Sequence, residues 1–377
     1  MNVLQISHDF HGSKVYCNLY KSIDAAGVNQ IVYTYYDDDK YNGRNRFDAA
    51  HTEIIYSKAL NKYDRYFYHY KIHKIYKDIT KKVDLKNVDI SHATTLFSDG
   101  GAAYKLFKKK GIPYIVSVRN TDINVFLARM WHTWPFCKKI LLNARKIVFI
   151  SEAHRRQFVV HPYISKFISK IEDKIIVLHN GIDDFWIDNV ILGREVSADN
   201  HNLIYVGVYD ANKNVLSLMD AVLMLKTKYQ DIKLTLVGGK GNLKDLVKQK
   251  AEKSSGVVEF KGQITDKQVL LNIYRLNSVY AMPSHTETFG LVYIEALSQG
   301  LACIYTKGQG IDGMFDDTIG IGVNSQSTDD IARAIDFIFE HRSYFNNKTV
   351  DFEQFRWSYI AQQYLSYYMN IFSKNSE

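Results

Sequence analysis

The pattern that most constrains the fold is an alternation of short apolar runs with amphipathic stretches, which starts twice along the chain. The first series begins at Val3 to Ser7 and the second at Leu203 to Gly207. Runs of this length predict buried strands, and the stretches between them have apolar residues at helical spacing. Alternating strands and helices form parallel sheets with helices on both faces. Since 377 residues exceed one ordinary domain, we predict two α/β domains.

The two series place the domain boundary between about residues 185 and 202, which predicts domains at residues 1–190 and 196–355. Further strands are predicted at residues 30–35, 88–92, 112–118, 146–150, 175–178, 233–237, 257–260, 279–282 and 304–305. The loops that follow strands are the candidate ligand sites, because ligands bind at the carboxyl ends of strands in α/β sheets.

Two aromatic stretches in the first half admit two interpretations. Residues 59–86 place Leu60, Tyr63, Phe67, Tyr70 and further apolar positions at helical spacing, which favours a stripe packed in the core. Residues 126–139 are interpreted as a packed segment over the mouth of a cleft. The alternative for both stretches is contact with lipid headgroups, and for the second also contact with an acceptor, because basic side chains lie among the aromatic ones.

Cysteine usage and hydropathy indicate a cytoplasmic protein. Cys17, Cys137 and Cys303 are far apart and odd in number, so no disulfide framework or metal motif is predicted. The residues from Met1 to Ser7 run into a strand pattern without a secretory signal. No apolar run approaches the roughly 18 residues that a membrane-spanning helix needs.

The positive charge is concentrated in the first half of the chain. Residues 1–190 have 29 lysine and arginine residues against 19 acidic ones, whereas residues 191–377 have 19 against 21. A basic domain favours phosphate-bearing partners such as a membrane surface, a lipid-linked substrate or nucleic acid. A solvated lysine-rich surface is the alternative. Recognised nucleic-acid-binding motifs are absent, so no nucleic-acid partner is predicted.

Three adjacent carboxylates, Asp37 to Asp39, are the only run that suggests a divalent cation with a diphosphate. Lys40, Arg44 and Arg46 follow closely, which favours a solvated loop instead. We therefore predict no metal and no cofactor.

The stretch from Pro283 to Gly300 has the strongest chemical signal. Glu287 and Glu295 flank seven residues, and Gly290 between them permits close approach of backbone to a ligand. A helix that begins near Gly290 would direct free amides and its positive end toward a phosphate. One carboxylate in the loop and one in the first turns of the helix would then hold different parts of one ligand. An ordinary surface turn with two solvated glutamates is the alternative.

With its upstream landmarks, this stretch resembles glycosyltransferase family 4, whose members are retaining enzymes with the GT-B fold. The landmarks are Leu203 to Gly207 with Lys213, Leu236 to Gly238, Phe260 to Gly262, Pro283-Ser284, and Glu287 to Leu297. The resemblance implies two facing Rossmann-like domains and a C-terminal helix, residues 356–377, that crosses back to the first domain.

The resemblance also implies the role of each site residue. Glu287 would contact the donor sugar, Lys213 would neutralise the diphosphate, and Glu295 would bind the ribose hydroxyls. The base would be held by backbone near Ile264, and Gly12 would be the phosphate-side glycine of the first domain. The remaining residues expected at the donor are Gly238, Thr288, Phe289, Gly290 and Leu291.

Two positions depart from the family pattern. Val208 stands where the family usually has an arginine or lysine after the glycine, and Arg119 falls where it often has a histidine. One hypothesis joins them: Arg119 reaches across the cleft and supplies the missing positive charge, since guanidinium suits phosphate. An acceptor-side or structural role for Arg119 is the alternative.

The resemblance predicts transfer of a hexose-type sugar from a nucleotide diphosphate sugar, UDP rather than GDP, to a hydroxyl with retention and without a metal. We expect a glycan or lipid-linked glycan acceptor of surface polysaccharide biosynthesis, such as lipopolysaccharide or capsule, and peripheral contact with the inner membrane surface. A GT-B protein that binds nucleotide sugar without transfer, or a glycoside hydrolase that uses both glutamates, are the alternatives.

Overall fold

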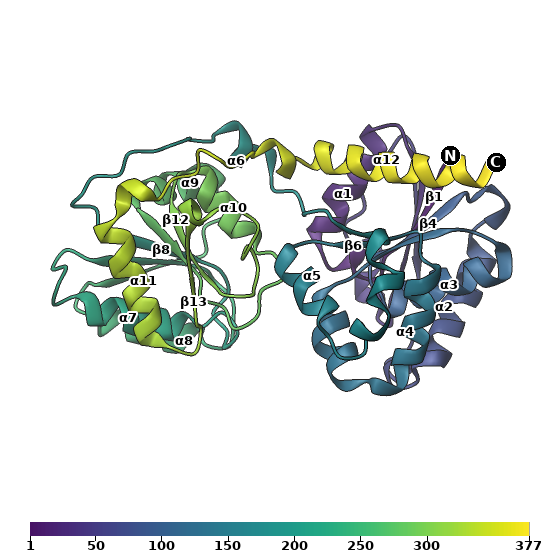
Figure 1. Ribbon diagram of the computed structural model, residues 1–377, viewed down its shortest axis with the longest axis horizontal. Helices are drawn as coiled ribbons and strands as arrows, with labels where there is room; N and C mark the ends of the chain where they lie inside the picture. The colour runs from purple at the N-terminus through teal and green to yellow at the C-terminus, as the bar shows by residue number, and fades with distance from the viewer. Residues whose placement is uncertain (377) are drawn as a thin grey trace. The chain divides into compact units, whose positions relative to one another are not determined.

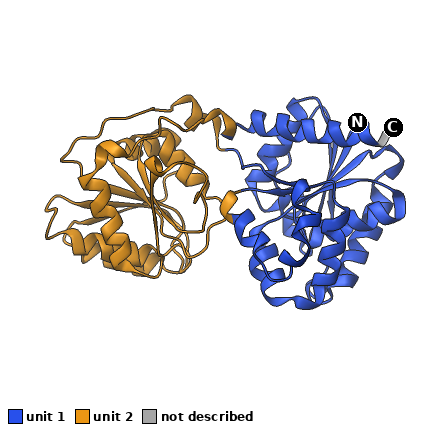
Figure 2. Ribbon diagram, viewed as in Figure 1, with its two compact units in different colours: residues 1–150, 154–181, 355–377 blue, residues 151–153, 182–354 orange. Residues whose placement is uncertain are grey.

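The structure is a computed structural model that describes residues 1–376, and these residues divide into two compact units (Figures 1 and 2). Unit 1 comprises residues 1–150, 154–181 and the chain from residue 355, and unit 2 comprises residues 151–153 and 182–354. Each unit is built on a single parallel sheet. The predicted pair of Rossmann-like α/β domains is therefore confirmed.

Unit 1 has a seven-stranded sheet in which all neighbouring strands are parallel. Its strands, in spatial order, are β3 (Thr52–Ser57), β2 (Asn29–Tyr35), β1 (Asn2–Ile6), β4 (Ile90–Ala93), β5 (Tyr114–Ser117), β6 (Lys146–Phe149) and β7 (Ile175–Val177). Strand β3 was not predicted, because this edge strand is mostly half-buried and lacks a continuous apolar run.

The two faces of this sheet are covered by different helices. In β1, Val3 packs with α1 (Lys14–Ala25) and α12 (Trp357–Ser376), whereas Leu4 and Ile6 pack with the opposite layer. That layer consists of α2 (Tyr68–Lys82), α3 (Ser98–Lys110) and α4 (Trp134–Asn143) (Figure 1). A short helix, α5 (Glu152–Val159), follows β6. Alternation along the strands thus gives two apolar cores, as a sheet buried on both faces requires.

The final helix, α12, belongs to unit 1, as the resemblance implied. Its buried face includes Trp357, Tyr364 and Tyr368. The Tyr368 hydroxyl bonds the Nδ1 atom of the buried His92 at 2.8 Å. A β-carbon at Gly181 would lie 2.6 Å from the Trp357 ring. Only glycine at this position therefore leaves space for the start of α12.

The packing of α2 confirms the later part of the predicted core stripe and corrects its aromatic part. Its buried residues are Tyr68, Ile72, Ile75 and Ile79. Of the four residues named for the expected stripe, only Leu60 is buried, whereas the three aromatic residues are exposed. The helix begins only at Tyr68, so Tyr63 and Phe67 precede it, and Tyr70 lies outside the face formed by its buried residues.

Unit 2 has a six-stranded parallel sheet. Its strands, in spatial order, are β10 (Val258–Gly262), β9 (Lys233–Val237), β8 (Asn202–Val206), β11 (Val279–Ala281), β12 (Ala302–Thr306) and β13 (Gly320–Val323). Its helices are α6 (Asp184–Asp188), α7 (Val215–Leu225), α8 (Lys244–Glu252), α9 (Lys267–Leu276), α10 (Leu291–Ser298) and α11 (Thr328–Glu340). The edge strand β13 was not predicted, because glycine occupies two of its four positions.

Unit 2 begins earlier than the predicted boundary at residues 190–196, since residues 182–190 belong to it. The reason is packing by α6: its Trp186 ring contacts the Tyr274 ring of α9, with centroids 5.5 Å apart. The cap residue of α6, Asp183, pairs with Lys267.

Among the described residues, no helix is long and apolar enough to cross a membrane, and no group of three or more His, Cys, Asp or Glu side chains is placed to hold a metal ion. Two carboxylates of the Asp37 to Asp39 run pair with lysines instead: Asp38 with Lys40, and Asp39 with Lys58.

Candidate active site

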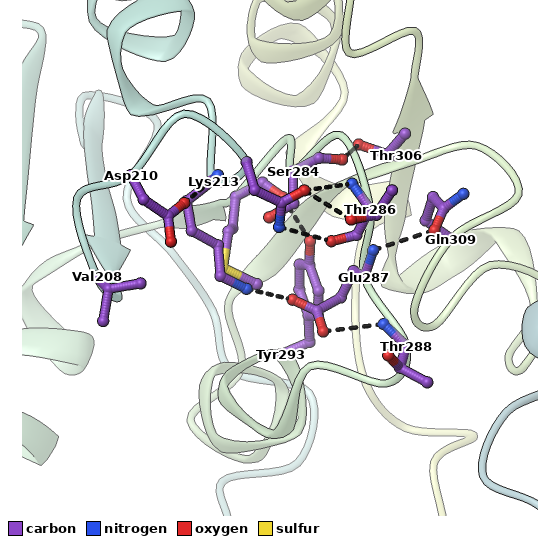
Figure 3. Close-up of polar contacts among 12 residues, drawn as sticks. Val208, Asp210, Lys213, Ser284, Thr286, Glu287, Thr288, Tyr293, Thr306 and Gln309 are labelled. Atoms are coloured by element: carbon purple, nitrogen blue, oxygen red, sulfur yellow. Dashed lines mark hydrogen bonds and ion pairs between the residues drawn. The ribbon is translucent and has the colours of Figure 1, made fainter. Parts of the chain in front are cut away.

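The candidate active site of unit 2 lies where its central strands end. The loops after β8 and β11 meet because the Thr286 hydroxyl donates to Asn212. The loop after β12 joins them because the Glu287 amide donates to Gln309 (Figure 3). Carboxyl ends of parallel strands share one edge of the sheet, so polar residues from distant parts of the chain converge there.

Lys213 and Glu287 form the centre of this site. The Lys213 Nζ atom lies 2.6 Å from Glu287 Oε2, and the two side chains are only 21% and 14% exposed. Glu287 Oε1 accepts a hydrogen bond from the Thr288 amide at 3.0 Å. The Glu287 amide in turn donates to Gln309 Oε1 at 3.0 Å. Both carboxylate oxygens are therefore held in place, and the pair presents a fixed cation to a ligand.

Asn212 joins the loop of Lys213 to the loop of Glu287, and it was not predicted as a site residue. Its Oδ1 atom accepts from the Thr286 amide at 3.0 Å and from the Thr286 hydroxyl at 2.6 Å. Its amide nitrogen donates to the Thr286 carbonyl at 2.9 Å. On the other side of the lysine, Asn214 donates to the carbonyls of Pro283 and Ser325. The sequence signal that could have identified Asn212 is a lysine flanked by two asparagines in a loop after a strand.

Gly290 precedes α10 in the left-handed conformation, with φ of 77° and ψ of 74°, which glycine adopts without strain. Glycine has no side chain to cap the helix, so no side chain accepts a hydrogen bond from the first amides of α10. Phe289 is buried and anchors the loop, while Leu291 begins the helix. The predicted helix start is thus where an anion would meet backbone amides.

Glu295 lies in the second turn of α10. Burial raises the pKa of its carboxyl to about 7; the nearby Asp183 raises it further, and Lys267 opposes both. Among the described residues, no side chain or backbone amide donates a hydrogen bond to the Glu295 carboxylate. A half-buried acceptor of this kind is suited to hydroxyl donors on a ligand.

Gly238 and Ile264 lie on loops after neighbouring strands of the same sheet. A β-carbon at Gly238 would lie 2.0 Å from the Gly207 carbonyl oxygen, so the contact between the β8 and β9 ends requires glycine. Ile264 is half-buried just beyond β10. Val208 is 38% exposed beside this edge, and its carbonyl accepts from the Tyr205 hydroxyl at 2.6 Å. Its side chain brings no charge to the site.

Gly12 and Arg119 belong to unit 1, each just beyond the end of a strand in its sheet. A β-carbon at Gly12 would meet only the Asp9 carbonyl at 3.7 Å, so the fold of unit 1 does not itself require glycine there. Arg119 Nε donates to the Thr94 carbonyl at 3.1 Å, and its guanidinium lies over the Tyr16 ring, 5.5 Å from the centroid.

Asp122, which the sequence analysis did not assign, anchors the loop around Arg119. Its Oδ2 atom accepts from the amides of Arg119 at 2.8 Å and Leu96 at 3.0 Å, and Oδ1 accepts from Phe97 at 3.1 Å. Burial raises the pKa of this carboxyl to about 7, although the three amides oppose the shift. Asp122 therefore positions the backbone from which Arg119 extends.

Comparison with known families decides the relationship. Residues 12–184 match the family described as Glycosyltransferase Family 4, and residues 194–353 match the family described as Glycosyl transferases group 1. The chain belongs to glycosyltransferase family 4. The resemblance inferred from the stretch between Glu287 and Glu295 is confirmed.

Among curated relatives, this family 4 chain is 28% identical over 203 residues to a protein of Salmonella typhimurium named lipopolysaccharide 1,2-N-acetylglucosaminetransferase. The match covers 50% of this chain and 53% of the Salmonella protein, so it spans about half the length of that relative.

Solved structures share the fold along the whole chain. Sucrose-phosphate synthase of Thermosynechococcus elongatus has a TM-score of 0.73 at 19% identity, covering 99% of this chain and 100% of that one. Anabaena HepE, solved in complex with UDP, has a TM-score of 0.68 at 15% identity and covers 98% of this chain and 100% of its own. These likenesses establish the GT-B fold of this family 4 member.

Proposed function

We propose that this chain transfers a hexose-type sugar from a UDP-sugar to a hydroxyl of a glycan or lipid-linked glycan, with retention at the anomeric carbon and without a metal. The observation that most supports the proposal is the Lys213 and Glu287 pair beside the start of α10. It places a cation, helix amides and a carboxylate at one strand edge, which suits a diphosphate joined to a sugar.

Charge stabilisation is the main chemical task in this proposal. As the bond between the anomeric carbon and the phosphate oxygen breaks, its electron pair passes to the diphosphate. Lys213 and the first amides of α10 meet that growing negative charge. The acceptor oxygen bonds to the anomeric carbon on the same face, and its proton passes to the departing phosphate oxygen. Glu287 orients the sugar hydroxyls and Lys213 during this step.

The choice of donor and acceptor draws on the relatives. The Anabaena protein of similar fold was solved with UDP, and the Salmonella relative is named for transfer to lipopolysaccharide. We extend both to this chain and propose UDP as the nucleotide and a surface polysaccharide intermediate as the acceptor, handled in the cytoplasm.

A panel of nucleotide sugars tests this proposal. We expect UDP-glucose, UDP-galactose or UDP-N-acetylglucosamine to raise the melting temperature and to give saturation-transfer NMR signals, with GDP-mannose giving less. Lys213→Met should abolish most of the shift, because the diphosphate loses its cation. The matched control, Lys233→Met, changes an exposed lysine at the far end of β9 and should respond like the wild type. Equal responses to UDP and GDP sugars would contradict the UDP assignment.

A second candidate is a protein that binds nucleotide sugar without transferring it, and Val208 favours it. An exposed aliphatic side chain replaces the usual cation, so the diphosphate is less fully neutralised. Slow hydrolysis of the donor in the absence of acceptor would demonstrate a competent site and exclude this candidate. Hydrolysis of a nitrophenyl glycoside without nucleotide would instead support a glycoside hydrolase.

Substitution of Arg119 tests whether unit 1 supplies the positive charge that Val208 lacks. Under the proposal, Arg119→Ala lowers turnover about 10-fold to 100-fold, because one cation that stabilises the leaving diphosphate is lost. Steady-state kinetics and UDP titration measure the effect, with Arg333→Ala, an exposed arginine paired with Asp330 in unit 2, as the control. The melting temperature separates loss of the Thr94 and Tyr16 contacts from loss of charge. Unchanged donor binding and turnover would end the hypothesis.

A further inference from the structure

An exposed aromatic cluster precedes and opens α2 in unit 1. Tyr63, Tyr66, Phe67 and Tyr70 are 61%, 66%, 64% and 58% exposed. Four large rings within eight residues that all face solvent are costly unless they meet a partner. The adjacent Tyr68 is buried and packs in the core, so the segment with the exposed rings is anchored to unit 1.

A second exposed segment lies beside the first. Trp131 is 73% exposed and Val125 42% exposed. The two segments are joined by ring contacts, since Tyr68 lies 6.0 Å from Phe126 and His69 lies 5.4 Å from Phe136. Burial lowers the pKa of His69, and the charges of Lys105 and His132 lower it further, which places the second segment next to the first. We call residues 62–70 and 125–131 together the aromatic-basic surface.

The charges of this surface have one sign. Lys62, Arg65 and Arg129 are exposed among the rings. Residues 61–77 and 122–139 contain only two carboxylates, Asp64 and Asp122, and both are buried. Asp64 is neutralised by Lys74, whose Nζ atom lies 2.6 Å away.

Tyrosine and tryptophan rings together with lysine and arginine suit the boundary between water and lipid. Their rings enter the headgroup layer, and their polar tips remain hydrated. Cations near an anionic leaflet each add about 1 kcal/mol of attraction. An anionic bilayer repels exposed carboxylates, and both Asp64 and Asp122 are buried. A protein partner would not require the burial of both. We infer that the aromatic-basic surface docks unit 1 onto anionic phospholipid headgroups.

Vesicle co-sedimentation of the full chain tests this inference. We expect binding to phosphatidylcholine vesicles that contain about 30% phosphatidylglycerol, little binding to phosphatidylcholine alone, and release as salt rises. Lys62→Ala with Arg65→Ala should weaken binding about 25-fold, about fivefold per charge. Tyr66→Ser with Phe67→Ser and Tyr70→Ser should weaken it about tenfold or more, because the apolar area that enters the headgroup layer is removed.

Tyr344→Ser is the matched control, because Tyr344 is a 51% exposed tyrosine of unit 2 outside the surface, and it should bind vesicles like the wild type. Circular dichroism melting and UDP binding should be unchanged in every variant, which separates this surface from the donor site and from folding. Wild-type chain that ignores anionic vesicles, or variants that bind them equally well, would overturn the inference. Binding of soluble glycan that these variants abolish, without vesicle binding, would assign the surface to the acceptor instead.

Discussion

Glu287→Ala is expected to lower turnover by about 10²-fold to 10³-fold while free UDP binds as well as before or more tightly. The carboxylate holds Lys213 at 2.6 Å and, in the proposed function, orients the donor sugar. Its removal misplaces the sugar and the lysine in the transition state. It also releases Lys213 from its internal partner, so the lysine remains available to the phosphates of free nucleotide.

Isothermal titration with UDP and single-turnover kinetics with the UDP-sugar measure the two effects separately. Glu259→Ala is the control, because Glu259 is an exposed glutamate of β10 that pairs with Lys261. If Glu287→Ala lost free UDP binding to the same extent as a Glu295 variant, the division of labour between sugar and ribose would be wrong.

Glu295→Gln is expected to weaken nucleotide binding about 10-fold to 100-fold and, at the same time, to stabilise the fold at pH 8. Ribose hydroxyls donate better to a carboxylate than to an amide, and hydrogen bonds to charged groups contribute about 1.5 to 3 kcal/mol. The stability gain arises because the half-buried, unpaired carboxylate is costly to keep ionised. Its pKa of about 7 in the folded chain exceeds the ordinary 4.5.

The sign of the pH dependence follows from that difference. The folded chain holds the Glu295 proton more tightly than the unfolded chain, so the contribution of this carboxyl to the free energy of unfolding is complete below about pH 4.5 and lost as pH rises to about 7. Glutamine does not titrate, so Glu295→Gln should raise the free energy of unfolding by about 3 kcal/mol at pH 8 and by little at pH 4.5.

Urea unfolding at the two pH values, with Glu259→Gln as the control, measures this gain. Wild-type affinity for UDP should also decline as pH falls below about 7, because the protonated carboxyl is a weaker acceptor. Equal unfolding free energies of Glu295→Gln and wild type at both pH values would contradict the ionisation cost. Unchanged UDP affinity of the variant would contradict the ribose assignment.

The sequence by itself determined the α/β architecture, the family and the centre of the candidate site. Buried strands such as β8 and β11 are continuous apolar runs, and helices between them have apolar residues at regular spacing, so local pattern suffices. Glu287, Gly290 and Glu295 lie on one short segment, and their separation along a loop and a helix start is set by local geometry alone.

Only the tertiary structure decided which side chains from distant segments meet. Asn212 contacts Thr286 across 74 positions of sequence, and Asp122 holds the amides of Leu96 and Phe97. The aromatic residues around the start of α2 could not be placed from spacing, because Tyr63, Phe67 and Tyr70 have the same pattern whether they face the core or solvent. Burial depends on which surface the neighbouring elements cover, and that is fixed by long-range packing rather than by local periodicity.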